Sequence, residues 1–151
     1  MINPNLILSI RRLPNGEGLP LPNYQTPGAA GMDLFAANAS TLNIFMGDTC
    51  LVSTGIAVEI PHGFEGQIRP RSSMARRGLI IPNAPGTIDC DYRGELMVLL
   101  SSTSTAPYIE IRRGDRIAQL IIAPVLQLPV IEVEHLTETV RGERGFGSTG
   151  R

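Results

Sequence analysis

The chain has no lysine and no tryptophan, and only two cysteines and two histidines among its 151 residues. Without lysine it cannot contain a phosphate-loop lysine, form a Schiff base or bind pyridoxal phosphate covalently. All 13 basic residues are therefore arginine. Any phosphate must be bound by arginine side chains, hydroxyl groups and backbone N–H groups.

The scarcity of cysteine and histidine excludes further classes. No spacing among Cys50, Cys90, His62 and His135 resembles a zinc site, and two lone cysteines do not make a disulfide framework. We expect a reduced, cytoplasmic protein. The N-terminal residues do not resemble a signal peptide and no apolar run reaches the length of a membrane span, so we expect no membrane association. A net charge of −1 argues against a general nucleic-acid-binding protein.

Glycine and proline are abundant, with 16 and 12 residues, which predicts frequent turns. Short strands are predicted at residues 6–11, 29–36, 52–60, 64–69, 95–100, 108–111, 116–125 and 130–136. One helix of about two turns is predicted near residues 72–78, with Ser72 or Ser73 as its N-cap and Gly78 after its last turn. The pattern predicts an all-β jelly-roll-like sandwich or barrel with one short helix.

The segment 83–95 carries the densest functional signal. Its Pro85-Gly86 pair predicts a β-hairpin, and strand backbone can pair with the edge of a nucleobase, assisted by the Asn83 amide. Asp89 follows as a carboxylate and Tyr92 as a flat ring. Asp89 and Asp91 could position a water molecule or hold a metal, or they could simply cap turns.

Two other segments are candidates for binding phosphate. Arg71, Ser72 and Ser73 at a helix N-terminus would favour an anion, although the same residues also fit an ordinary helix cap. Residues 141–151 contain four glycines, three arginines and one phenylalanine, Phe146. We expect a single domain, 1–140, followed by a flexible glycine-rich lid, 141–151, that closes on a phosphorylated ligand; the alternative is a disordered terminus.

Taken in order, five segments carry a family resemblance. They are Ala30-Gly31-Met32-Asp33-Leu34, the Pro-Arg-Ser-Ser of residues 70–73, the Gly-Thr-Ile-Asp-Cys-Asp-Tyr-Arg-Gly-Glu of 86–95, the Gly-Asp-Arg-Ile-Ala-Gln-Leu of 114–120, and the glycine-rich residues 141–150. This series resembles the ordered motifs of the trimeric dUTPase family, from about residue 24 to the C-terminus.

The resemblance implies a homotrimer of jelly rolls with active sites at subunit interfaces. It implies Mg²⁺-assisted hydrolysis of dUTP to dUMP and pyrophosphate by attack of water at the α-phosphate, which would keep uracil out of DNA and supply dUMP for thymidylate synthesis. By matching position, the residues that would bind substrate are Arg71, Ser72, Ser73, Asn83, Gly86, Thr87, Ile88, Tyr92, Met97, Gln119, Arg141, Phe146, Gly147, Ser148 and Thr149.

The same resemblance assigns roles. Asp89 would hold the attacking water and contact the 3′-hydroxyl, and Tyr92 would pack under the deoxyribose. Asp33 would reach Mg²⁺ only through its water shell. Arg71, from one subunit, would contact phosphates together with its neighbouring serines, and the lid would come from another subunit.

Some positions depart from the family pattern or stay open. Ser73 and Arg144 stand where glycine is usual, and we assign Arg116 and Asp115 to the trimer interface rather than to the ligand. Strict strand alternation would place Asp89 and the ring at position 92 on opposite faces, unless the chain twists or bulges between them.

Two rival functions are considered. The first is a dCTP deaminase, whose Arg-Ser-Ser-x-Ala-Arg segment matches residues 71–76. Its catalytic glutamate would align with Leu99, and leucine cannot transfer protons. The second is a non-enzymatic jelly-roll binding module, which gives no reason for a lid or for Asp89 beside Tyr92.

Overall fold

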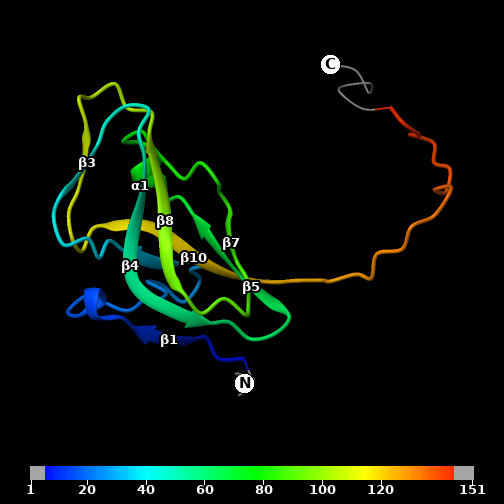
Figure 1. The fold of residues 1–151 in the computed structure, drawn as a ribbon, viewed down its shortest axis with the longest axis horizontal. Coiled ribbons are helices and arrows are strands. Elements are labelled where there is room, and N and C mark those ends of the chain that lie inside the picture. The colour runs from blue at the N-terminus through cyan, green and yellow to red at the C-terminus, as the bar shows by residue number, and fades with distance from the viewer. Residues whose placement is uncertain (1–5, 145–151) are drawn as a thin grey trace.

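The computed structural model describes residues 6–144, which form a β-sandwich body and a long C-terminal arm (Figure 1). The all-β prediction is confirmed. The elements are β1 (Ser9–Arg12), the 3₁₀ turn η1 (Pro14–Gly16), β2 (Met32–Phe35), β3 (Leu42–Ile44), β4 (Thr49–Glu59), β5 (Phe64–Arg69), α1 (Ser72–Ala75), β6 (Leu79–Ile80), β7 (Gly86–Ile88), β8 (Glu95–Ser102), β9 (Ile109–Ile111) and β10 (Arg116–Pro124).

Two four-stranded sheets make the sandwich. One has the order β1-β4-β8-β6 and the other β2-β10-β5-β7, while β3 and β9 form a separate pair. Along β8, Leu96, Val98 and Leu100 are buried, whereas Met97 and Leu99 point outward. This alternation is the two-residue period expected of a strand with one face on the core. The result is a jelly-roll-like sandwich closed around one apolar core.

The helix predicted near residues 72–78 is shorter than expected. It spans four residues, Ser72–Ala75, and its N-cap is Arg71, without a side-chain capping bond, so the prediction of a two-turn helix capped by Ser72 or Ser73 is wrong. The helix ends early because Met74 is anchored in the core and the chain turns at Gly78, whose carbonyl accepts the N–H of Thr103 at 2.8 Å. Tertiary pairing thus overrides the local helical tendency.

The Pro85-Gly86 turn does not close a β-hairpin, contrary to prediction. The strand before it, β6, pairs with β8, and the strand after it, β7, pairs with β5 in the opposite sheet. Leu79 and Ile81 explain the difference, because both are buried in the core between the sheets. The turn therefore carries the chain from one sheet to the other.

Beyond Pro124 the chain leaves the body as an extended arm (Figure 1). The strand predicted at residues 130–136 does not form within this chain. Apolar side chains along the arm are exposed, with Val130 at 96%, Leu136 at 87% and Ile131 at 78%. No other part of residues 6–144 covers these side chains. Within residues 6–144, no helix has the length and apolar character needed to cross a membrane.

Candidate active site

Asp89 and Tyr92 lie at a tight turn that follows β7. The backbone N–H of Tyr92 donates to the carbonyl of Asp89 at 3.1 Å. Residues three apart in such a turn come to the same side, and both residues line one cavity of about 170 Å³. The conflict raised by strand alternation is thus resolved by a turn rather than by a twisted arm.

The same cavity is lined by further residues from β7 and β8. Thr87, Ile88 and Met97 belong to the predicted substrate-binding set. Glu95 also lines it and was missed, because the sequence marks it only as the residue that follows Tyr-Arg-Gly. At the other end of β7, the Asn83 amide lies against Gly86, with Nδ2 3.3 Å from the place where a Cβ would lie on Gly86.

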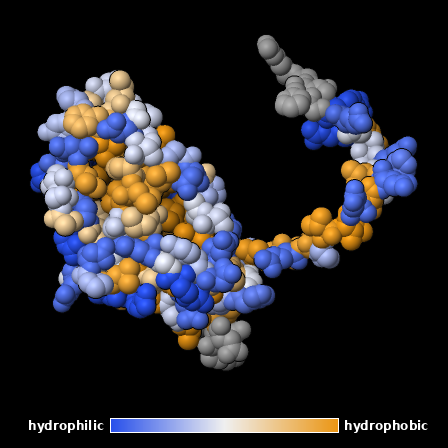
Figure 2. Space-filling view, viewed as in Figure 1, coloured by the Kyte–Doolittle hydropathy of each residue, from blue (hydrophilic) through white to orange (hydrophobic). Residues whose placement is uncertain are grey.

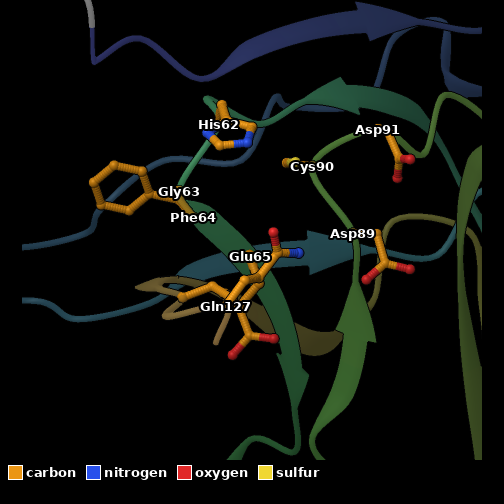
Figure 3. Close-up of a pocket in the computed structure, with 9 residues that line it drawn as sticks. His62, Gly63, Phe64, Glu65, Asp89, Cys90, Asp91 and Gln127 are labelled. Carbon is orange, nitrogen blue, oxygen red and sulfur yellow. The ribbon is translucent and has the colours of Figure 1, made fainter. Parts of the chain in front are cut away.

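A larger cavity of about 500 Å³ lies on the other side of this turn. Figure 3 shows the Cys90 sulfur directed toward His62 and the carboxylate of Asp91 on the opposite side of the chain. Within the described part of the chain, no group of three or more His, Cys, Asp or Glu residues is arranged to hold a metal ion. Asp89 and Asp91 are therefore not part of such a group among these residues.

A second cluster is built around Asp33 on β2. This carboxylate is 8% exposed, and it receives Arg71 Nε on Oδ1 at 2.8 Å and an Arg116 nitrogen on Oδ2 at 3.2 Å. The charge-assisted bond from Nε to Oδ1 orients the guanidinium of Arg71, while the bond from Arg116 holds the other oxygen of the carboxylate. Arg116, which we assigned to a subunit interface, thus takes part in a contact within its own chain.

Other predicted phosphate ligands gather around Arg71. Its terminal nitrogen lies 3.4 Å from the hydroxyl of Ser73, and Gln119 Nε2 donates to the carbonyl of Pro70 at 3.0 Å. In register, Gln119 of β10 stands opposite Asp33 on one side and Arg69 on the other. Four of the residues predicted to contact phosphate therefore share one end of this sheet: Arg71, Ser72, Ser73 and Gln119.

The two clusters lie at opposite ends of the β5–β7 pair. Ile88, next to Asp89, is paired with Gly66, and Arg71 lies five residues farther along the chain from Gly66. At a rise of about 3.3 Å per residue, that separation is about 16 Å along the strands. One chain alone therefore does not bring Arg71 to Asp89.

The predicted lid is only partly described. Arg141 Nε donates to the carbonyl of Arg144 at 3.0 Å, and Arg144 Nε donates back to the carbonyl of Arg141 at 3.1 Å. Phe146, Gly147, Ser148 and Thr149 lie outside the described residues.

Comparison with known proteins gives one consistent family. The family model described as dUTPase matches residues 17–150. A deoxyuridine 5′-triphosphate nucleotidohydrolase of Anaplasma marginale is 53% identical over 96% of this chain and 99% of its own length, and one of Methylocella silvestris is 54% identical over 96% and 92%.

Solved structures agree with these relatives. The Staphylococcus bacteriophage 80alpha dUTPase with dUPNHPP has a TM-score of 0.86 and 26% identity over 96% of this chain and 99% of that chain. A mutant dUTPase from phage phi11 of S. aureus, which coordinates a structural Mg(II) ion, shares the fold with a TM-score of 0.77 at 24% identity, over 87% and 99% of the two chains. On the ordered motifs, the sandwich and these matches, the chain belongs to the dUTPase family.

Proposed function

We propose that this protein hydrolyses dUTP to dUMP and pyrophosphate at sites shared between three copies of the chain. The observation that carries the proposal is the shared cavity of Asp89 and Tyr92 in a member of the dUTPase family. In the cytoplasm this reaction would keep uracil out of DNA and supply dUMP for thymidylate synthesis.

Recognition of the base is assigned to β7 and the turn before it. Backbone groups of Gly86, Thr87 and Ile88, with the Asn83 amide, would pair with the edge of uracil. Cytosine presents an amino donor where uracil presents an acceptor, so buried backbone groups would be left unpaired. The ring of Tyr92 would pack under deoxyribose and collide with a ribose 2′-hydroxyl.

Asp89 is the proposed general base. Its carboxylate would accept a proton from a water molecule as that water attacks the α-phosphorus, and pyrophosphate would leave from the opposite side. A positioned base of this kind contributes roughly 10² to 10⁴ in rate. Arg71, oriented by Asp33, would neutralise charge on the phosphates, with Gln119 and the hydroxyls of Ser72 and Ser73 beside it.

Magnesium fits this arrangement as an ion held mainly by the substrate. Mg²⁺ prefers phosphate oxygens and water to a cage of protein ligands, and residues 6–144 contain no such cage. Each oxygen of Asp33 receives one arginine and keeps a lone pair that can accept a hydrogen bond from metal-bound water. When bound, the ion would offset the charge of the triphosphate.

The trimer accounts for two features of the single chain. The phosphate cluster and the Asp89 cavity are separated along the β5–β7 pair, so one site would combine Arg71 of one copy with Asp89 of another. Apolar side chains also gather on the outer face over β4 and β8 (Figure 2), where Leu51 pairs with Leu99. This face and the apolar arm are the surfaces that we expect neighbouring copies to cover.

We further propose that residues 141–151 act as the lid, following the domain of residues 1–140. Arg141 would supply charge, Phe146 would stack on the base, and Gly147, Ser148 and Thr149 would approach the phosphates. Removing residues 141–151 should leave a folded trimer that hydrolyses dUTP poorly. Full activity in that variant would reject the lid.

Incubation with dUTP, dCTP and Mg²⁺ tests the reaction itself. We expect pyrophosphate from dUTP, whereas ammonia from dCTP would indicate deamination and neither product a binding module. Leu99, the position that would carry the deaminase glutamate, is an aliphatic residue facing outward on β8, which favours hydrolysis. Asp89→Asn should bind dUTP and lose turnover by orders of magnitude, while the matched control Asp91→Asn should retain most of it.

A further inference from the structure

The ring of Tyr92 is held by its own turn. Its hydroxyl donates to the backbone carbonyl of Glu95 at 3.0 Å, and its ring lies directly over Gly94. A Cβ added to Gly94 would lie 2.3 Å from the Tyr92 hydroxyl oxygen and 2.6 Å from Cζ. A side chain at position 94 would therefore displace the ring, and the carbonyl at position 95 determines where its far end lies.

The side chain of Glu95 is itself fixed from two directions. Its Oε1 accepts the backbone N–H of Gly55 at 2.7 Å and the side-chain amide of Asn15 at 2.8 Å. Gly55 lies in β4 at an irregularity in the pairing with β8, between Ser53 and Ala57, and has a φ of +69°. At such a bulge a strand residue loses its regular ladder partner, so the carboxylate of Glu95 provides the acceptor that the neighbouring strand does not.

The Asn15 end of this contact is also constrained. Gly16 crosses Gly55 so closely that a Cβ on Gly16 would lie 2.2 Å from the Gly55 carbonyl oxygen. Arg113, from the turn between β9 and β10, donates to the carbonyls of Asn15 and Glu17, both at 2.7 Å. The carboxylate of Glu95 thus links the start of β8 to a rigid crossing of η1 and β4.

We propose that Glu95 is a positioning residue for the sugar-binding surface. Its carboxylate fixes the start of β8, the carbonyl of the same residue holds the Tyr92 hydroxyl, and the ring is thereby kept where it excludes a ribose 2′-hydroxyl. This inference rests on the proposed hydrolysis of dUTP. It assigns selectivity for deoxyribose to Glu95, Gly55 and Asn15, none of which needs to touch the sugar.

The chemistry of the contact gives a discriminating pair of variants. Both hydrogen bonds end on the same atom, Oε1, so Glu95→Gln can keep them through its amide oxygen. Glu95→Ala loses both and leaves the Gly55 N–H without its acceptor. A direct electrostatic role in binding would instead be lost in both variants. Glu110→Ala is the matched control, because it removes a glutamate of β9 that pairs with Arg112, the residue after that strand.

The experiment compares kcat/KM for dUTP and for UTP in the wild-type chain and these variants. Small misplacements of a positioning group cost large factors in rate, so we expect the dUTP-to-UTP ratio to fall by about tenfold or more in Glu95→Ala. The KM for dUTP should rise more than kcat falls. The ratio for Glu95→Gln should stay within about threefold of the wild-type ratio. The ratio for Glu110→Ala should equal that of wild type. An unchanged ratio in folded Glu95→Ala, or equal losses in Glu95→Ala and Glu95→Gln, would overturn the inference.

A second comparison tests whether Glu95 acts through the Tyr92 ring. It uses several variants, so it does not depend on the folding of any one of them. Tyr92→Phe removes only the bond to the Glu95 carbonyl, and Gly94→Ala displaces the ring directly; both should lower the ratio. Adding Glu95→Ala to Tyr92→Phe should cost little more than either change alone, whereas additive losses would contradict the link. If the wild-type chain does not hydrolyse dUTP, the proposed function fails. If it does hydrolyse dUTP, but the dUTP-to-UTP ratio is unchanged in the Glu95 and Gly94 variants, only this inference fails.

Discussion

Replacing Ile131 by alanine tests whether the C-terminal arm holds the copies together. Ile131 is 78% exposed in the single chain, so its apolar surface would be buried only against another copy. Full burial of an isoleucine side chain contributes about 1.5–3 kcal/mol. We take about 2 kcal/mol per arm and therefore about 6 kcal/mol for three arms.

That loss predicts a measurable change in assembly. A loss of about 6 kcal/mol raises the trimer dissociation constant by roughly 10⁴, since about 1.4 kcal/mol is tenfold. The midpoint concentration of a monomer–trimer equilibrium varies as the square root of that constant, so it should rise by roughly a hundredfold. Sedimentation velocity over a dilution series measures this midpoint, and a constant low urea concentration can bring a very tight trimer into range.

Leu21→Ala is the control for the arm variant. Leu21, like Ile131, is an exposed aliphatic side chain, with 43% of its surface exposed. It lies in the loop between η1 and β2 rather than in the arm. We expect its midpoint to match wild type. If Ile131→Ala also leaves the midpoint unchanged, the arm does not dock through this side chain, and the reasoning from its exposure is refuted.

Three further predictions follow from the described contacts. Asp33→Asn keeps one acceptor for Arg71 but removes the charge that Arg71 and Arg116 share. Because these ion pairs are partly solvated, we expect urea titration to show a loss of about 1–2 kcal/mol in the free energy of unfolding. Turnover of dUTP should also fall clearly, and unchanged turnover would argue against a role for Asp33 in orienting Arg71. Gly55→Ala puts a Cβ 2.3 Å from the backbone of η1 at a φ of +69° and should lower the free energy of unfolding by about 2–4 kcal/mol. The control Gly47→Ala, at a φ of +84° in open space, should lower it by only about 1 kcal/mol. Equal losses in the two variants would show that crowding at Gly55 is unimportant. Burial, with a nearby acidic charge, raises the pKa of Cys50; its thiol therefore ionises at higher pH than a free thiol, and alkylation by iodoacetamide, followed by mass spectrometry, should remain slow at about pH 8, while a rate equal to that of glutathione would contradict the burial.

The local pattern predicted most strands because their alternation and turn residues are encoded in short segments. The strand at residues 64–69 has the predicted bounds, and that at 95–100 is extended by only two residues in β8. Two of the errors, the longer helix and the hairpin, occur where a distant strand competes for the backbone. Ser72 and Ser73 favour a longer helix, and Pro85-Gly86 favours a hairpin, yet burial of Met74 and Leu79 directs the chain otherwise.

The site divides in the same way. The motif residues Asp89, Tyr92 and Met97 were identified from the sequence, and the structure places them around one cavity. Glu95 could not be identified, because its partners Asn15 and Gly55 are 80 and 40 residues away in the chain. No local pattern specifies such a contact.

The sequence by itself determined the available chemistry: a chain without lysine, in which arginine must bind phosphate, and an ordered set of motifs typical of dUTPases. Only the tertiary structure decided how those residues are distributed in space. The register of β5 against β7 separates Arg71 from Asp89, and the turn after β7 brings Asp89 and Tyr92 together. The physical reason is that strand register is set by burial and pairing between remote segments, whereas residue chemistry belongs to each position alone.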